Sequence, residues 1–288
     1  MSLFAAVGHQ GQRIVSSDGA EWTHLQTGKE GEIYRAAAAG NGVTVAIGNY
    51  GGNNLISMTR DGGAWEQVSR EGQYKNFFRG LAFGNGRFLA IGGDPGSVGS
   101  SSPFVAQSDD GVKWTEYLFI SGKHILRRAA WGGDRWVGVG DRGRRSMSRD
   151  GKEWVDAADL KATDTLVDVA FGAGKFVGVG LHGLRSVTED GLRWTHRFPG
   201  EEGEHLNSIL WAGDRFVAVG QGATYVSPDG IEWTRRENRD APLTAAFGGG
   251  VFVGIAYKGK ILRSTDAVEW KQVYKAEHHL EAVTWGGA

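Results

Sequence analysis

The sequence predicts an all-β protein, a seven-bladed β-propeller built from four-stranded antiparallel blades. Three observations carry this prediction. A seven-residue cassette occurs seven times, and successive copies are 37 to 49 residues apart, which is the length of one propeller blade. The first and last segments of the sequence together supply one repeat. The chain of 288 residues contains 47 glycines, which fits one large domain rich in tight turns.

The cassette has the pattern Ser/Thr-x-Asp-Gly-x-x-Trp, and its copies are SSDGAEW, TRDGGAW, SDDGVKW, SRDGKEW, TEDGLRW, SPDGIEW and STDAVEW. Successive spacings of 43, 49, 40, 40, 39 and 37 residues separate the cassette aspartates Asp18, Asp61, Asp110, Asp150, Asp190, Asp229 and Asp266. In a tight turn, Asp accepts backbone N–H bonds, Gly supplies a positive φ, and Trp fills space between blades. We therefore interpret all seven aspartates as structural. The last copy has Ala267 in place of Gly, so we expect a slightly strained or altered turn there.

The two ends of the sequence are predicted to share one blade. From Asp266 to the last residue is 22 residues and the first 18 lead to Asp18, which together give 40, the commonest spacing. The segment LEAVTWGG at Leu280 matches LRRAAWGG at Leu126, and FAAVG at Phe4 matches the WVGVG that follows in the complete repeat. We therefore expect the last strand to pair with the first ones, which closes the ring and removes open sheet edges.

Each repeat contains four stretches with strand character. The innermost has the pattern Leu-x-x-Ala-x-Trp/Phe-Gly, the second resembles RFVAVG at 215–220, the third runs up to the cassette, and the fourth starts at its Trp. We expect a single domain spanning 1–288. Its blade 1 is formed by 280–288 plus 1–27, and blades 2 to 7 lie at about 34–70, 78–119, 126–158, 166–197, 206–236 and 243–274.

Composition limits the classes of partner. The formal net charge is -1, so nucleic acid and anionic membrane surfaces are not expected partners. No cysteine is present, which excludes disulfides, thiolate metal sites and a cysteine nucleophile. The first residues, MSLFAAVG, lack the features of a signal peptide. We expect a soluble cytoplasmic monomer, unless a signal peptide has been removed, and no cofactor is required for the fold.

The cassette resembles the Asp-box of sialidase-type propellers with bacterial-neuraminidase repeats. All seven copies lack the extra residue often found between Asp and Gly in that box, so the resemblance is to the broad repeat class. It extends over essentially the whole chain. It implies a propeller whose boxes are structural turns away from ligands, and it implies little about function. A true sialidase is not expected, because that resemblance would require an Arg-Ile-Pro motif and six blades.

The variable face opposite the cassettes is predicted to bind ligands, because the connections that differ between repeats surround the channel mouth there. One position of the inner strand holds Arg35, Arg79, Arg127, Val167, Asn207, Leu243 and Glu281 in blades 2 to 7 and 1. Three arginines at one level would bind a carboxylate or phosphate; the alternative is that each pairs with a nearby carboxylate such as Asp94, Asp141 or Glu281. Asn207 and Tyr257 complete the predicted ligand-binding set. Insertions at 49–54 and 92–104 would overhang the same sector as a mobile flap.

Two further constellations are considered on the same face. Histidines such as His124, His205 and His279 would hold a metal if they converge, against the alternative of surface or hydrogen-bonded histidines. Asp168 and Glu281 start inner strands, where most blades have small or neutral residues, and are the candidates for a general acid or base.

Three function classes follow from these features. The leading one is a non-catalytic binding scaffold that recognises a protein, a peptide or an anionic small ligand at the channel mouth. The alternative is a hydrolase or lyase, metal-dependent or glycan-active, with its site at the same mouth. The third is a structural assembly factor, similar to the photosystem-assembly type of repeat propeller, which would require an exposed apolar patch.

Overall fold

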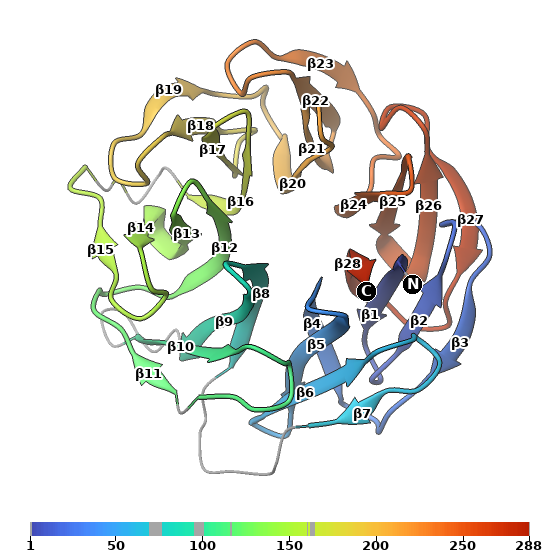
Figure 1. Ribbon diagram of the computed structural model, residues 1–288. Helices are drawn as coiled ribbons and strands as arrows, with labels where there is room; N and C mark the ends of the chain where they lie inside the picture. The colour runs from blue at the N-terminus through green and yellow to red at the C-terminus, as the bar shows by residue number, and fades with distance from the viewer. Residues whose placement is uncertain are drawn as a thin grey trace. The chain divides into compact units, whose positions relative to one another are not determined.

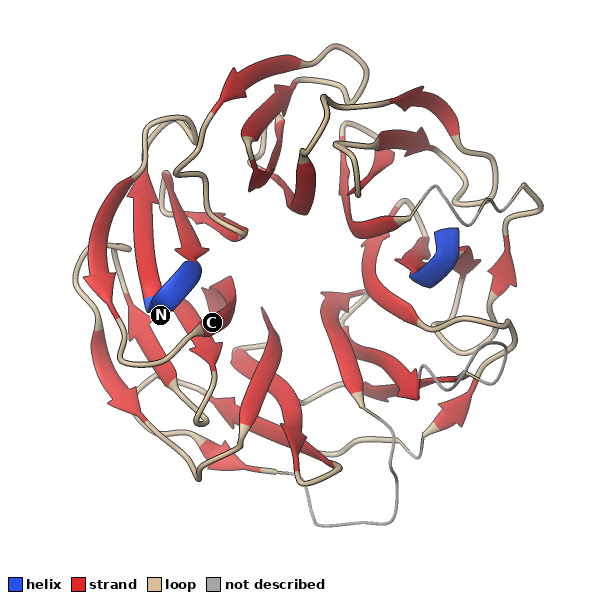
Figure 2. Cartoon of the chain, turned by 180° about the vertical axis from the view of Figure 1, so that it is seen from behind, coloured by secondary structure: helices blue, strands red, loops and turns tan. Residues whose placement is uncertain are grey.

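A computed structural model describes residues 2–68, 77–94, 101–115, 117–159, 161 and 165–287. It confirms the predicted fold class, an all-β seven-bladed β-propeller whose blades are four-stranded antiparallel sheets (Figure 1). The helical segments among the described residues are two single 3-10 turns, η1 (Asp141–Gly143) and η2 (Tyr257–Gly259), shown in blue in Figure 2. No helix in these ranges has the length and apolar character needed to cross a bilayer. Residues 95–100 of the predicted flap lie outside the described residues.

The chain forms two compact units, the first comprising Met1–Ala90, Ala106–Glu116 and Thr244–Ala288. This unit contains blade 1, with strands β28 (Leu280–Gly287), β1 (Ser2–Gly8), β2 (Arg13–Ser16) and β3 (Thr23–Gln26). Blade 2 consists of β4 (Ile33–Gly40), β5 (Val43–Tyr50), β6 (Asn53–Thr59) and β7 (Glu66–Gln67). Blade 7 consists of β24 (Thr244–Gly248), β25 (Val251–Ala256), β26 (Lys260–Ser264) and β27 (Lys271–Lys275).

The second unit comprises Ile91–Val105 and Tyr117–Leu243. Its blade 4 consists of β12 (Leu126–Gly132), β13 (Arg135–Gly140), β14 (Arg145–Ser148) and β15 (Val155–Asp156). Blade 5 consists of β16 (Leu166–Gly172), β17 (Lys175–Gly180), β18 (Arg185–Thr188) and β19 (Thr195–Phe198). Blade 6 consists of β20 (His205–Trp211), β21 (Phe216–Gln221), β22 (Ala223–Ser227) and β23 (Thr234–Glu237). The blade 3 sheet has residues in both units and consists of β8 (Phe78–Gly84), β9 (Arg87–Asp94), β10 (Ser102–Ser108) and β11 (Leu118–Phe119).

Blade 1 is completed by the last strand, as predicted. Strand β28 pairs antiparallel with β1, with Phe4 opposite Trp285 and Ser2 opposite Gly287. The pair extends over the whole of β1, so the inner edge of β1 is covered by backbone hydrogen bonds.

The cores lie between neighbouring blades, because each sheet is apolar on both faces. In the first unit, Phe4 and Ile14 of blade 1 pack with Val253 and Ile255 of blade 7, and all four are almost fully buried. A glycine ends the inner strand so that an aromatic ring of the next blade can lie on it. At Gly172 an added Cβ would lie 2.2 Å from the Trp211 ring, so any larger residue would push these blades apart.

The seven cassettes form one repeated turn. The Asp Oδ1 accepts hydrogen bonds from the second and third following backbone N–H groups, as at Asp229, where the distances are 2.8 and 2.9 Å to Ile231 and Glu232. The side-chain oxygen of the cassette Ser or Thr accepts the backbone N–H of the Gly or Ala that follows the Asp. In six copies the Trp ring N–H donates to the carbonyl oxygen of this Gly or Ala. Ala267 keeps these bonds and takes φ 67°, so the last turn is strained rather than altered.

Candidate functional site

The inner-strand position predicted to face ligands coincides with a β-bulge. The register between inner and second strands shifts across this position in blades 1, 2, 4, 5 and 6, at Glu281, Arg35, Arg127, Val167 and Asn207. A bulged residue is left out of the ladder, and its side chain is directed differently from those of its neighbours. The fold therefore presents one variable side chain at the same place in each of these five blades.

In the first unit these positions form a contact group that we call the Glu281 cluster, defined as His9, Arg35, Tyr257, His279 and Glu281. Glu281 Oε1 lies 2.7 Å from His9 Nε2 and 3.9 Å from an Arg35 terminal nitrogen. The His9 and His279 rings meet edge to face at 5.4 Å between centroids, and Tyr257 stacks on His279 at 6.3 Å. The cluster thus joins blades 7, 1 and 2 through side chains.

Buried amides hold Arg35 in place. Arg35 Nε donates to Asn49 Oδ1 at 3.0 Å, and Asn49 Nδ2 donates to Asn54 Oδ1 at 3.1 Å. The same Asn54 oxygen accepts from the Phe78 backbone N–H at 3.0 Å, and both amides are more than nine-tenths buried. This series of hydrogen bonds fixes the Arg35 guanidinium before any ligand binds, which lowers the entropic cost of binding.

The cluster is accessible rather than enclosed. Side-chain exposures are 38% for His9, 33% for Arg35 and 28% for Glu281, and Tyr257 is 66% exposed. Exposed charge pairs are screened by water, so the arrangement suits recognition better than chemistry that requires a dry site. Tyr257 is one of the largest exposed apolar surfaces among the described residues.

The other two predicted arginines have neighbours of their own. Arg79 lies over the Phe77 ring at 5.6 Å, and Arg127 pairs with Asp141. The Arg127–Asp141 pair and the Arg35–Glu281 contact correspond to the alternative considered from the sequence, in which each arginine pairs with a nearby carboxylate. Asn207 is exposed at its bulge in blade 6.

Asp168 is a structural acceptor in the second unit. Its Oδ1 accepts the Val169 N–H and its Oδ2 accepts the Ile209 N–H, both at 2.9 Å, so it links the inner strands of blades 5 and 6. Burial raises the pKa of this carboxyl, opposed by the nearby Arg128 charge and by these hydrogen bonds.

Two of the three histidines predicted to hold a metal, His205 and His279, each lie beside another histidine. His279 contacts His9 in the first unit, and His205 contacts His182 in the second, with rings 5.5 Å apart. The His205 Nδ1 accepts the His182 backbone N–H at 3.2 Å, and the His124 carbonyl accepts from Arg144. Within the described parts of the chain, no three His, Cys, Asp or Glu side chains are grouped to hold a metal ion.

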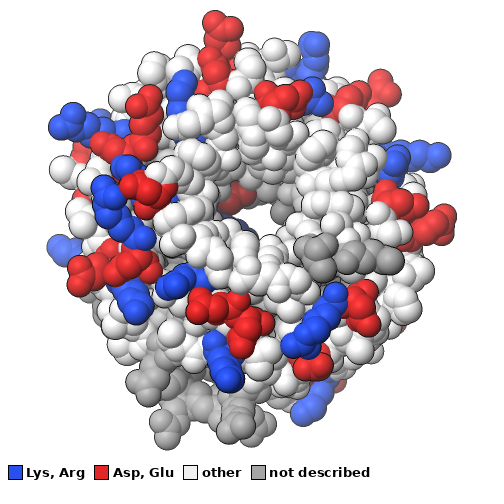
Figure 3. All heavy atoms as spheres, viewed as in Figure 1, with Lys and Arg blue, Asp and Glu red and all other residues white. Residues whose placement is uncertain are grey.

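Charge on the face drawn in Figure 3 is mixed, with acidic and basic side chains interspersed. Local arrangements of charge therefore matter more than an overall electrostatic field.

Asn49 and Asn54 were not singled out as site residues from the sequence. The signal that would have marked them is the pair of amides on both sides of the 49–54 turn, at buried positions facing the arginine of the same blade.

Comparisons with known proteins extend this description. No protein-family model matches the chain, and no curated protein matches it. Among solved structures it is similar to YCF48 bound to D1 peptide, with a TM-score of 0.67 and 16% identity over 90% of this chain and 86% of that one. Virginiamycin B lyase from Staphylococcus aureus gives a TM-score of 0.68 at 9% identity, covering 85% and 84%. The WD40 propeller domain of Doa1 gives 0.65 at 12%, covering 92% and 87%. At these identities the similarity shows the fold alone.

Proposed function

We propose that this protein is a non-catalytic binding scaffold that recognises a peptide or protein segment through the Glu281 cluster. The observation that carries the proposal is the exposed Tyr257 stacked on His279, next to an Arg35 that buried amides hold in position. Aromatic and arginine side chains of this kind dominate protein recognition energetically. YCF48, a protein of similar fold, has been solved with a peptide bound, which supports this class of partner.

The carboxylate of the partner is expected to meet Arg35. A planar guanidinium binds a carboxylate bidentately, and Glu281 and His9 restrict which side of it a ligand approaches. A small anionic ligand with the same carboxylate is the simpler version of this partner. The scaffold is proposed to act as a monomer, and its cassettes are proposed to be Asp-box turns, which the hydrogen bonds at Asp229 support.

A random peptide library selected on the immobilised full chain tests this proposal. Peptides that bind the wild type are titrated calorimetrically against R35A and Y257A, and each variant is expected to weaken binding by about tenfold or more. The matched control is F119A, which removes another exposed aromatic ring, 56% exposed in blade 3, and should leave the affinity unchanged. If R35A and Y257A both bind these peptides with the affinity of the wild type, recognition at the cluster is disproved.

A hydrolase or lyase is the second candidate, favoured by the raised pKa of Asp168. A panel of chromogenic esters and glycosides, assayed with wild type and D168N near pH 5, separates the two functions. Turnover by wild type that D168N loses would support an enzyme. Peptide binding that D168N retains, without turnover, would support the scaffold.

A further inference from the structure

The hairpin between β5 and β6 in blade 2 is longer than the corresponding hairpin of blade 7. Strand β5 has eight residues and ends at Tyr50, whereas β25 has six and ends at Ala256. The last pair of the longer hairpin, Tyr50 with Asn53, adjoins a turn of two glycines, both with positive φ. An added Cβ on either glycine would meet no atom of the described residues within 4 Å. The tip of this hairpin therefore projects into open space.

The ring of Tyr50 lies over the connection between blades 1 and 2. An added Cβ at Gly31 would lie 3.8 Å from this ring, and the Lys29 Nζ lies 5.9 Å from its centroid. A cation near a ring face is attracted to it, so Lys29 helps to hold the ring in place. Tyr50 nevertheless keeps 36% of its surface exposed. The hairpin thus presents an aromatic ring that is supported and still accessible.

The same connection joins Tyr50 to the Glu281 cluster. The Gly31 N–H donates to the side-chain oxygen of Gln10 at 2.9 Å. Gln10 directly follows His9, which belongs to the cluster. The cluster in turn reaches blade 7 at Tyr257, which is 66% exposed. Contacts therefore lead from Tyr50 in blade 2 to Tyr257 in blade 7, all within the first unit.

Arg35 lies between the two tyrosines in the order of these contacts. Its terminal nitrogen faces Glu281 of blade 1 at 3.9 Å, on the side of the cluster that leads to Tyr257. Its Nε donates to Asn49, the residue directly before Tyr50. We call this set of contacts, the Glu281 cluster together with Gln10, Gly31 and Tyr50, the elongated surface. It presents an aromatic ring, a fixed cation and a second aromatic ring in succession.

We propose that the elongated surface binds an extended peptide segment in which one acidic residue has an apolar or aromatic residue on each side. This inference rests on the proposed function of the Glu281 cluster and adds the form of its partner. The acidic side chain meets the Arg35 guanidinium, and the flanking side chains lie on the rings of Tyr257 and Tyr50. A small anionic ligand at Arg35 does not reach rings that belong to blades 7 and 2, so it gains nothing from Tyr50.

Peptides selected on the immobilised full chain are titrated against Y50A to test the second ring. Y50A is expected to weaken binding by about fivefold or more, because an aromatic contact at the interface is lost. Y50F keeps the ring and should retain the wild-type affinity. The matched control is L25A, which removes a side chain of 43% exposure from the outer strand of blade 1 and should leave binding unchanged.

The length of the partner is tested with the acidic residue of each peptide on its own, acetylated and amidated. It carries the carboxylate without the flanking side chains, so we expect it to bind at least about tenfold more weakly than the peptide. Equal affinity of this single residue and the whole peptide would overturn the inference, since a small anion would then be a sufficient ligand.

Double-mutant cycles between protein and peptide test the order of the contacts. Each peptide residue is changed to alanine and titrated against the wild type, R35A, Y50A and Y257A. The residues coupled to Tyr50 and to Tyr257 are expected on opposite sides of the acidic residue coupled to Arg35, each with a coupling of about threefold or more in affinity. Coupling of both tyrosines to one peptide residue, or of Tyr50 to none, would overturn the elongated surface.

Failure of this inference and failure of the proposed function give different results. If R35A and Y257A weaken binding and Y50A does not, the cluster remains a peptide site and the elongated surface is wrong. If none of the three variants weakens binding, or no peptide is selected, the proposed function fails and the elongated surface fails with it. Y50A should keep the wild-type melting temperature because its ring lies at a projecting tip, and Y50Q takes its place in the titrations if it does not.

Discussion

Single residues in the cassette turns account for much of what is regular in this protein. Asp229 holds two backbone N–H groups, and Gly230 takes φ 78°, a conformation that strains any residue with a Cβ. The same roles recur at Asp266 and Ala267, where the chain tolerates the strain. The two turns therefore differ in backbone strain although their hydrogen bonds are the same.

Gly230→Ala is expected to destabilise the protein by roughly 2–4 kcal/mol, from left-handed strain plus overpacking. An added Cβ would lie 2.5 Å from a Val177 methyl group. The matched change Ala267→Gly removes strain and one buried methyl group together, so it should stay within about 1 kcal/mol of the wild type. Guanidinium denaturation measures both, and equal effects would contradict the strain argument.

The pH dependence of two aspartates should have opposite sign. Backbone N–H bonds from Glu232 and Ile231 hold the pKa of Asp229 below its ordinary value. Its stabilisation is therefore present above the unfolded-state pKa of about 3.9 and is lost as the pH falls through the folded-state pKa. Asp229→Ala should then reduce the free energy of unfolding more at pH 7 than at pH 3.

For Asp168 the pKa is raised, so its stabilisation is fully present below about pH 3.9 and declines as the pH rises through the folded-state value. Asp168→Ala should cost more at pH 4 than at pH 7. Denaturation curves at the two pH values check this, and a larger cost at pH 7 would show that the ionised carboxylate is the stabilising form.

The inner strands combine a core pattern that repeats in every blade with one position that varies between blades. The sequence predicted their pattern, because a core position such as Leu126 recurs in sequence. It also placed Arg35 and Glu281 at one level of the repeat. The sequence could not show the bulge that directs these side chains, since a bulge depends on pairing with a partner strand. The Arg127–Asp141 contact was foreseen only as an alternative, because turn geometry decides it.

The second and third strands of blade 2 support the first. Asn54→Leu is expected to destabilise the protein by about 1–3 kcal/mol, because the Phe78 N–H and the Asn49 amide would be left buried without this acceptor. It should also weaken any ligand that depends on Arg35. Denaturation and peptide titration measure the two effects. Asn53→Ala, at the edge of the same strand, serves as the control, and equal losses from both variants would exclude a specific role for Asn54.

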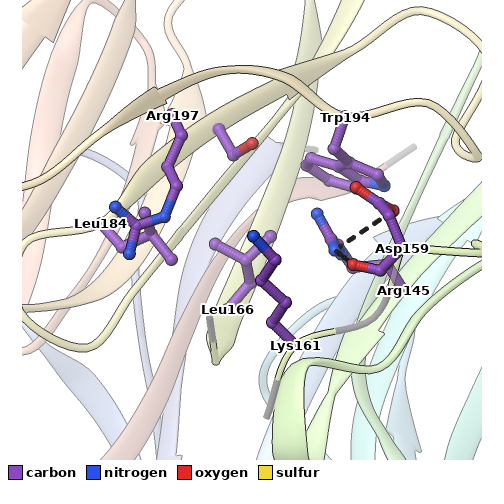
Figure 4. Close-up of a pocket in the computed structure, with 8 residues that line it drawn as sticks. Arg145, Asp159, Lys161, Leu166, Leu184, Trp194 and Arg197 are labelled. Carbon is purple, nitrogen blue, oxygen red and sulfur yellow. Dashed lines mark hydrogen bonds and ion pairs between the residues drawn. The ribbon is translucent and has the colours of Figure 1, made fainter. Parts of the chain in front are cut away.

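At the scale of the whole molecule, the features that could be predicted are those that repeat in the sequence. Seven cassettes and the match between Leu280 and Leu126 predicted the blade count and the shared blade, both of which the sheet topology confirms. A cavity of about 200 Å³ beside Arg145, in the second unit, was not predicted (Figure 4). It is lined by side chains of neighbouring blades, such as Arg145 and Leu166, and their packing in space does not follow from the repeat pattern.

Removing 280–288 should unfold the protein or drive it to associate, since blade 1 would lose its inner strand and expose β1. Light scattering after size exclusion, together with thermal melting, measures the outcome. A deletion variant that remains monomeric with an unchanged melting temperature would show that the β28–β1 pairing contributes little to stability.

The pairing of β28 with β1 also sets the order of events during synthesis on a ribosome. About 250 residues separate Gln26, where β3 ends, from Leu280, where β28 begins. At roughly 5–20 residues per second, the first three strands wait about 12 to 50 s for the fourth. During that interval β1 exposes an unpaired, apolar edge, so blade 1 is the part of the nascent chain for which a chaperone would matter most.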